Sequence, residues 1–227
     1  MAKIITSKEA AALIKSGDSI MFGGFLGCGT PKNTTKELAA LGTDNLTVMC
    51  NDGGKILPDG SYYGISSIIH NKQIKKLYAT HIGINPEIGQ QWNAGEMDVV
   101  LIPQGSFAEM IRAGGAGLGG VLTPTGVGTI TEGYEYVREK VTLDGRDYLL
   151  LKTLKADFAL IEGHTVDKAG NVWYKGTARN FCPMMATAGK TVIVEAENLV
   201  EVGEIAPENV VTSGIFVDYI VYDGGNK

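Results

Sequence analysis

Up to residue 112 the sequence repeats one unit, in which a short apolar run is followed by a turn and then by a segment with the pattern of a helix. We predict strands at the apolar runs 18–22, 46–50, 76–79 and 98–102. We predict helices at 7–15, 32–41, 64–70, 85–93 and 107–112, with Ser7 as the N-cap of the first. Strands that alternate with helices pair in parallel, because each helix carries the chain back across the sheet. The pattern therefore predicts an open, mostly parallel, doubly wound α/β sheet.

After residue 120 the pattern changes to that of β-hairpins. Asp144-Gly145 stands between two β-prone runs, and this dipeptide is typical of a two-residue hairpin turn. A second hairpin is predicted over 167–174, and single strands at 157–161, 191–195 and 215–221. The sequence shows no internal repeat and no linker-like segment, so we expect a single domain over residues 1–227, with β-hairpin additions in its second half.

Charge and hydropathy exclude two classes of partner. The formal net charge is −5 and no stripe of Lys and Arg occurs, which argues against a nucleic-acid-binding protein. No stretch approaches the roughly eighteen apolar residues that a membrane-spanning helix needs. Residues 1–5 lack the long apolar region of a signal peptide. We therefore expect a cytoplasmic protein that binds neither nucleic acid nor membrane.

The thiols and histidines give no metal-binding pattern. Cys28, Cys50 and Cys182 are odd in number and widely spaced, which argues against a disulfide framework and against a zinc site. The histidines also lack metal-ligand spacing, so we expect no metal. His81 follows a predicted strand, where it is either catalytic or hydrogen-bonded within its loop. Cys28 is either a nucleophile or, more simply, a small residue tolerated in a tight turn.

A glycine-rich turn joins the predicted strand 18–22 to the predicted helix 32–41. Thr30 can cap this helix and Pro31 suits its first position. Glycine admits a positive φ and lacks a Cβ atom, so such a turn can bring backbone N–H groups close to an anion at the helix N-terminus. Glycine-rich turns also occur for packing alone, and the spacing here is not that of a dinucleotide-binding loop. The candidate ligand-binding residues are Gly23, Gly24, Phe25, Leu26, Gly27, Cys28 and Gly29.

Gln104 is the candidate catalytic residue. It follows the predicted strand 98–102 and lies between Pro103 and Gly105, so its side-chain amide can point into a cleft at the carboxyl edge of the sheet. An amide donor at such an edge can stabilise a developing oxyanion. The alternative is a glutamine that only caps the following helix. Glu197 and Glu208 begin the only Glu-Asn pairs of the chain, and both lie in charged, surface-like stretches that suit a nucleophile poorly.

Several motifs, in order along the chain, resemble those of one protein family. An apolar triplet, Gly-Gly-Phe, three further residues and Gly-x-Pro stand at 20–31. The other matching segments are 80–87, 95–99, 103–106, 111–117, 123–129 and 177–181. On these motifs the chain resembles the alpha subunits of the two-subunit, family I coenzyme A (CoA) transferases, most of all the bacterial subunits that act on acetoacetate with acetate or butyrate. The family has Asp or Asn where this chain has Ser16.

The resemblance implies a division of labour between two chains. In this family a glutamate of the beta subunit, in a Ser-Glu-Asn-Gly context, attacks the acyl-CoA, and CoA passes through a covalent intermediate in ping-pong fashion. This chain has no Ser-Glu-Asn-Gly. It therefore resembles the subunit without the nucleophile, and we expect a beta-subunit partner in an α2β2 or larger assembly. The expected substrates are a short-chain acyl-CoA and a short carboxylic acid, and CoA is a carrier rather than a permanently bound cofactor.

The resemblance also assigns roles to the candidate residues. It implies that the loop Gly23 to Gly29 binds CoA and that Gln104 lines the oxyanion site. An alternative function is a sugar-phosphate isomerase-like or effector-sensing domain, because the same general fold hosts both. Another is a CoA-binding partner that regulates a different enzyme. The first alternative predicts binding of phosphosugars by the isolated chain, and the second predicts CoA binding without transfer.

Overall fold

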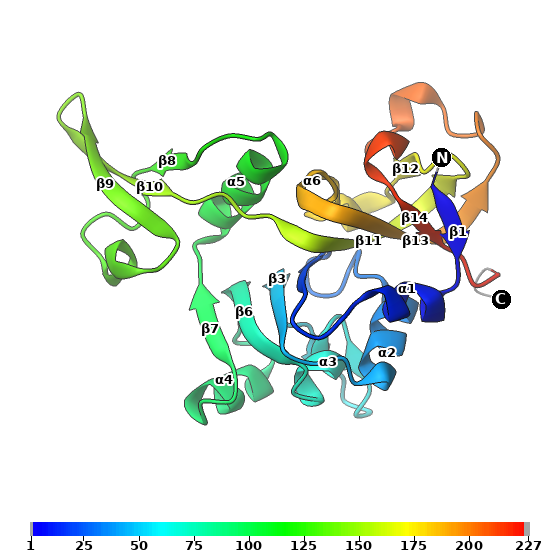
Figure 1. The fold of residues 1–227 in the computed structure, drawn as a ribbon, viewed down its shortest axis with the longest axis horizontal. Helices are drawn as coiled ribbons and strands as arrows, with labels where there is room; N and C mark the ends of the chain where they lie inside the picture. The colour runs from blue at the N-terminus through cyan, green and yellow to red at the C-terminus, as the bar shows by residue number, and fades with distance from the viewer. Residues whose placement is uncertain (1, 225–227) are drawn as a thin grey trace.

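The computed structural model describes residues 2–224, and its centre is a sheet in which nine strands of this part of the chain take part. The strand order is β1-β14-β13-β11-β2-β3-β6-β7, with β12 paired to β11 (Figure 1). The strands are β1 (Lys3–Ile5), β2 (Ser19–Phe22), β3 (Leu46–Asp52), β6 (Ile74–His81), β7 (Asp98–Leu101), β11 (Ala156–Asp167), β12 (Val172–Trp173), β13 (Gly189–Val200) and β14 (Tyr219–Val221). Neighbours along the path are parallel, and only β12 runs antiparallel to its neighbour. The predicted fold class is confirmed.

Helices cover both faces of this sheet, which makes it doubly wound. The helices are α1 (Ser7–Leu13), α2 (Lys32–Leu41), α3 (Ser66–His70), α4 (Pro86–Asn93), α5 (Gln104–Gly115) and α6 (Cys182–Ala188). Strand β2 shows why both faces are apolar: Met21 packs in the core beneath α5 and α6, whereas Ile20 and Phe22 pack in the core beneath α1 to α4. A continuous apolar run is typical of a strand buried on both sides.

A second, three-stranded sheet forms an arm that extends from the body at the upper left of Figure 1. It consists of β8 (Val121–Thr123), β9 (Val137–Leu143) and β10 (Arg146–Leu151). The predicted turn is confirmed, with Asp144 and Gly145 both at positive φ (50° and 74°) between β9 and β10. Lys76 on β6 ties the base of the arm to the body through Glu135, at 2.6 Å.

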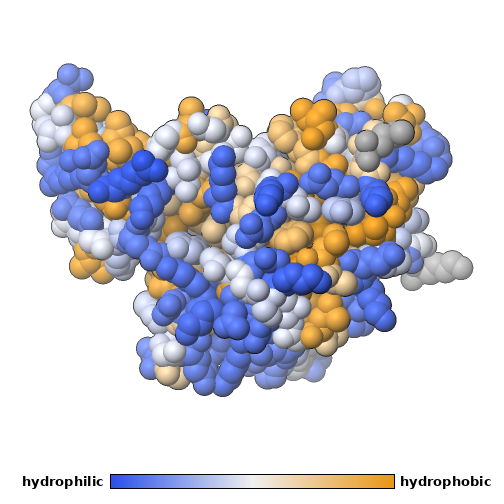
Figure 2. Space-filling model, viewed as in Figure 1, coloured by the Kyte–Doolittle hydropathy of each residue, from blue (hydrophilic) through white to orange (hydrophobic). Residues whose placement is uncertain are grey.

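Short elements complete the chain. A two-stranded hairpin joins β4 (Lys55–Ile56) to β5 (Tyr62–Tyr63). The 3-10 helices are η1 (Ile130–Gly133), η2 (Gly176–Arg179), η3 (Pro207–Asn209) and η4 (Gly214–Phe216). Figure 2 shows polar side chains over much of the lower half of the molecule and apolar ones both on the arm and at the right-hand side of the body. Those exposed on the arm are Leu122, Ile130 and Leu143. Within residues 2–224, no helix has the length and apolar character needed to cross a membrane.

The structure differs from the sequence prediction at several boundaries. The N-cap of α1 is Thr6 rather than Ser7, because Thr6 and Glu9 form a reciprocal capping box. Helix α5 begins at Gln104, three residues before the predicted start, and α6 was not predicted at all. The predicted strand 215–221 is wrong in its first half, where η4 occupies Gly214–Phe216. Strand β1 was also missed.

Candidate functional site

Polar side chains meet where β3, β6 and β7 end, at the carboxyl edge of the sheet. The Nε2 atom of Gln104 donates to Oδ1 of Asn51 at 2.6 Å, and Thr80 donates to the same oxygen at 3.0 Å. Nδ2 of Asn51 donates to Oδ2 of Asp52 at 2.8 Å. The backbone N–H of Leu26 donates to that same Asp52 oxygen at 2.8 Å. A continuous chain of hydrogen bonds therefore connects Gln104 to the glycine loop, and the edge predicted from topology brings these two candidates together.

The tip of the glycine loop is a tight two-residue turn. Phe25 and Cys28 exchange two backbone hydrogen bonds of 3.0 Å, and Leu26 and Gly27 lie between them at φ 52° and 81°. Leucine seldom adopts a positive φ, because its Cβ atom approaches the following carbonyl oxygen. The bond from Leu26 to Asp52 holds it there. As a result, the side chains of Phe25 and Leu26 point outward and remain 41% and 43% exposed.

The glycines of the loop are required by its internal packing. A Cβ atom on Gly24 would lie 2.1 Å from Oγ1 of Thr30, and one on Gly27 would lie 2.3 Å from the Tyr63 ring. One on Gly29 would lie 2.6 Å from the carbonyl oxygen of Ala178. These contacts are too short for any Cβ atom, so packing alone accounts for glycine at these positions. The glycine content therefore gives no independent support for a ligand, and any role in binding has to rest on the location of the loop.

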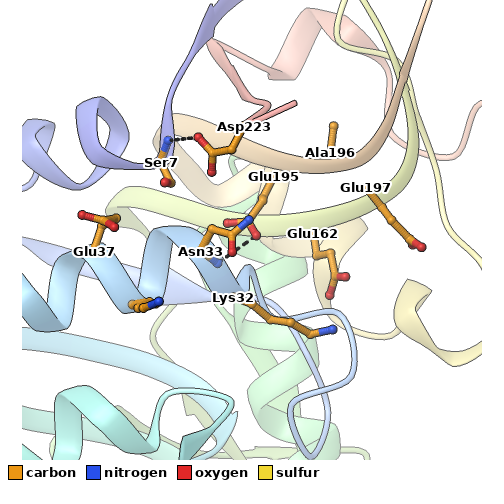
Figure 3. Close-up of a pocket in the computed structure, with 10 residues that line it drawn as sticks. Ser7, Lys32, Asn33, Glu37, Glu162, Glu195, Ala196, Glu197 and Asp223 are labelled. Atoms are coloured by element: carbon orange, nitrogen blue, oxygen red, sulfur yellow. Dashed lines mark hydrogen bonds between the residues drawn. The ribbon is translucent and has the colours of Figure 1, made fainter. Parts of the chain in front are cut away.

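The predicted cap of α2 is wrong. The N-cap is Pro31, and the Thr30 hydroxyl donates to the carbonyl oxygen of Gly23 at 2.9 Å instead. The free amides of the helix are taken by Glu195 of β13, which accepts from the N–H groups of Asn33 at 2.9 Å and Thr34 at 2.8 Å. Figure 3 shows this carboxylate directed at the first turn of α2. A carboxylate of the protein thus already occupies the positive end of the helix, and the predicted anion site there is not open.

An acidic pocket of about 440 Å³ lies beside this cap (Figure 3). Burial raises the pKa of Glu162 to about 7, and Glu195 and Glu197 add to the rise while Lys32 opposes it. In Figure 3 the side chain of Lys32 extends towards Glu162. His164 pairs with Glu197 at 2.6 Å and packs edge-on against Trp173. Five carboxylates and two lysines of the chain line this pocket, so it is unsuited to an anionic ligand.

The remaining candidates form no recognisable catalytic group. His81 lies exposed at the end of β6, whereas the imidazoles that pair with a carboxylate within residues 2–224 are those of His70 and His164. In the same part of the chain, no group of three or more His, Cys, Asp or Glu side chains is placed to hold a metal ion. All three cysteines are free. Burial raises the pKa of the Cys182 thiol to about 12, which makes it a poor nucleophile.

The sequence predicted some members of this site and missed others. Gln104 was predicted, whereas Asn51 and Asp52 were not among the candidate residues. Their position directly after the predicted strand 46–50 was the signal that could have identified them, and in the structure β3 extends through both. Glu195 was missed because it lies 162 residues from the helix it caps. No local pattern reports a contact over that separation.

Comparison with known proteins gives one consistent result. The family model described as "Coenzyme A transferase" matches residues 4–223. The chain is 44% identical to the acetate CoA-transferase subunit alpha of Escherichia coli K12, over 99% of each chain. It is 48% identical to the acetoacetyl-CoA:acetate/butyrate CoA transferase alpha subunit of Clostridium acetobutylicum, over 96% of this chain and 97% of the relative.

Solved structures agree on the fold. An acyl-CoA transferase from E. coli O157:H7, in a thioester complex with CoA, superposes with a TM-score of 0.87 at 20% identity. This chain is covered completely and spans 48% of that structure, about half its length. Glutaconate coenzyme A-transferase from Acidaminococcus fermentans gives a TM-score of 0.80 at 20% identity, over 97% of this chain and 75% of that structure.

Proposed function

Since the chain belongs to the coenzyme A transferase family, we propose that it is the alpha subunit of an enzyme that moves CoA between a short-chain acyl-CoA and a short carboxylic acid. The observation that carries this proposal is the nearly full-length identity of 44% and 48% with alpha subunits named for acetate and for acetoacetyl-CoA with acetate or butyrate. The proposed assembly pairs this chain, folded as one domain, with a beta subunit, in an α2β2 or larger complex.

The carboxylates near the site support a nucleophile on the beta subunit. Asp52 is 7% exposed and accepts hydrogen bonds from Leu26, Gly54 and the Asn51 side chain. Glu195 is 8% exposed and caps α2. A carboxylate that is buried and fully hydrogen-bonded cannot approach a thioester. Asp52 and Glu195 are thus committed to structure, as expected of a subunit that receives its nucleophile from a partner.

The proposed chemistry consists of two matched exchanges. A carboxylate oxygen of the partner's glutamate bonds to the acyl carbon, and the CoA sulfur leaves as a thiolate. The thiolate then attacks the glutamyl carbonyl carbon of the resulting anhydride and releases the acyl group as its carboxylate. The second acid attacks the glutamyl-CoA thioester, and the same steps run in reverse. Each attack places negative charge on a carbonyl oxygen, which an amide donor can stabilise.

We assign that donor to Gln104 and the approach of CoA to the loop from Gly23 to Gly29. One N–H of the Gln104 side-chain amide is held by Asn51, which fixes the direction of the second. The loop lies two hydrogen bonds further along the same network, through Asp52 to the N–H of Leu26. A phosphosugar-binding function gains no support from the structure, because Glu195 blocks the helix N-terminus that would receive a phosphate.

The proposal is tested by a transfer assay with acetoacetyl-CoA and acetate, using this chain alone and together with its beta subunit. The same mixtures are analysed by mass spectrometry after incubation with acyl-CoA. We expect turnover only in the pair, with a CoA-sized adduct on a glutamate of the beta chain. An adduct on this chain, or turnover by this chain alone, would show that it carries its own nucleophile.

A further inference from the structure

A pocket of about 580 Å³ opens beside the glycine loop, and the chemistry proposed above does not use its side chains. One wall is the tip of the loop, and the other is η2 with the residue that follows it. The lining residues are Phe25, Leu26, Cys28, Thr177 and Asn180. None of them carries a charge, in contrast to the acidic pocket of Figure 3.

The loop wall presents apolar side chains at an energetic cost. Leu26 is held at φ 52°, a left-handed conformation that is unfavourable for a residue with a Cβ atom. The turn and the bond to Asp52 impose it, and they direct Phe25 and Leu26 outward with about two fifths of their surface exposed. Observed strain of this kind is concentrated where a side chain serves a ligand.

In the opposite wall, the side-chain amide of Asn180 is hydrogen-bonded to the protein itself. Nδ2 of Asn180 donates to the carbonyl oxygens of Cys28 at 2.8 Å and Thr177 at 2.6 Å, while its Oδ1 accepts from the N–H of Phe181 at 2.6 Å. The Thr177 hydroxyl lies 3.4 Å from Sγ of Cys28. These bonds also fix the distance between the two walls. The amide donors of this wall are therefore occupied.

Because the walls are uncharged and the amide donors of Asn180 are occupied, the pocket disfavours binding of the polar parts of the substrates. A nucleotide needs cationic or amide donors for its phosphates, and the pantetheine arm of CoA carries two amides that lose free energy when they are buried without partners. An alkyl chain has no such requirement and gains free energy by leaving water. The pocket adjoins the polar network because Leu26 belongs to both, so a chain whose carboxyl group reaches that network can continue into the pocket.

We infer that this pocket binds the alkyl chain of the transferred acid and that the side chains of Leu26, Cys28 and Thr177 set the preferred chain length. The inference rests on the proposed function and deepens it, since it names straight-chain aliphatic acids as the substrate class. Each methylene buried in such a pocket is worth about fourfold in kcat/KM. The preference therefore rises with chain length until the pocket is full.

The test uses the complete alpha–beta complex with the straight-chain acids from acetate to hexanoate as acceptors and acetoacetyl-CoA as donor. Cys28→Leu narrows the pocket, so the ratio of kcat/KM for butyrate to kcat/KM for acetate should fall at least tenfold. Leu26→Asn keeps a residue that tolerates the left-handed conformation but replaces the apolar wall, and it should flatten the dependence on chain length. Leu41→Asn is the matched control, an exposed leucine on α2 outside the pocket.

Three outcomes separate the alternatives. Unchanged chain-length ratios in active Cys28→Leu and Leu26→Asn complexes would overturn the pocket assignment and leave the transferase function intact. An equal rise in KM for every acyl-CoA, whatever its chain, would place the pantetheine arm in the pocket instead. If the wild-type complex transfers no CoA, the proposed function fails. In that case the pocket assignment is tested by calorimetric titration of hexanoate into the wild-type and Cys28→Leu complexes, which needs no turnover. Equal affinity of the two for hexanoate would overturn the assignment.

Discussion

Gln104 is both exposed and held in a fixed orientation, a combination that a purely structural residue would not require. It is exposed at the first turn of α5, yet its amide is held 2.6 Å from Asn51 across the carboxyl edge of the sheet. A glutamine that merely capped the helix would bond to the backbone of α5, and no such side-chain bond is made at this N-terminus. The helix-cap interpretation left open by the sequence is therefore not supported.

Removing this amide should slow the chemical step more than it weakens binding. We expect Gln104→Ala to lower kcat by about 10²–10³, the usual effect of losing one oxyanion donor, with the KM for acyl-CoA changed less than about threefold. Glu109→Ala on the same helix, which removes only an exposed pair with Arg112, is the control. A variant in which KM alone changed would show that Gln104 binds substrate and does not stabilise the oxyanion.

Glu162 should make stability depend on pH. Its pKa is about 7 in the folded protein against 4.5 for the ordinary side chain, chiefly through burial, with Lys32 opposing the shift and Glu195 and Glu197 adding to it. The folded state thus binds the proton more tightly than the unfolded chain. The stability from this group is fully present below pH 4.5 and is lost as the pH rises through 7.

Glu162→Gln removes that titration while it keeps the size of the side chain. Relative to the wild type, we expect the variant to gain about 3 kcal/mol in the free energy of unfolding between pH 5 and pH 8, an order-of-magnitude figure for a largely buried carboxyl. Urea unfolding at several pH values measures it. Parallel stability curves for the two proteins would show that Glu162 is not protonated near neutrality.

At the scale of single elements, caps decided how well the sequence could be interpreted. The bounds of α2 were predicted correctly, Lys32–Leu41, because Gly42 ends the helix at φ 68° in the left-handed conformation that favours glycine. The N-cap of α1 was assigned one residue too late because both Thr6 and Ser7 are good caps, and only the geometry shows that Glu9 bonds back to Thr6. Local sequence patterns therefore predict the presence of a helix well, but they do not distinguish between two adjacent residues that could both be its N-cap.

The two candidate caps of α1 can be separated by mutation. Thr6→Ala should reduce the free energy of unfolding by about 1 kcal/mol, because it leaves the N–H of Glu9 without its acceptor. The matched variant Ser7→Ala keeps the capping box and should change stability much less. Chemical denaturation of both, side by side, makes the comparison. A larger loss from Ser7→Ala would restore the cap that the sequence first suggested.

At the scale of the whole molecule, the strand order of the central sheet was only partly predictable from the sequence. The alternation of strands and helices predicted the parallel sheet, and the resemblance predicted a nucleophile supplied by another chain. Neither predicted that β11 and β13, from the last third of the chain, occupy the middle of the sheet beside β2. Glu195 and the walls of the apolar pocket follow from that placement. Contacts between distant segments carry no periodic signal, so they were the part of the site that the structure had to supply.

The strand order also affects how the protein is made on the ribosome. Strand β2 bonds to β3 on one side and to β11 on the other, and β11 begins at Ala156, well over a hundred residues later. At ordinary rates of translation that delay is on the order of ten seconds. For that time the open edge of β2 and the apolar residues around it are available to other nascent chains. Molecular chaperones that shield strand edges should therefore raise the yield of this subunit, whatever the stability of the folded protein once it has formed.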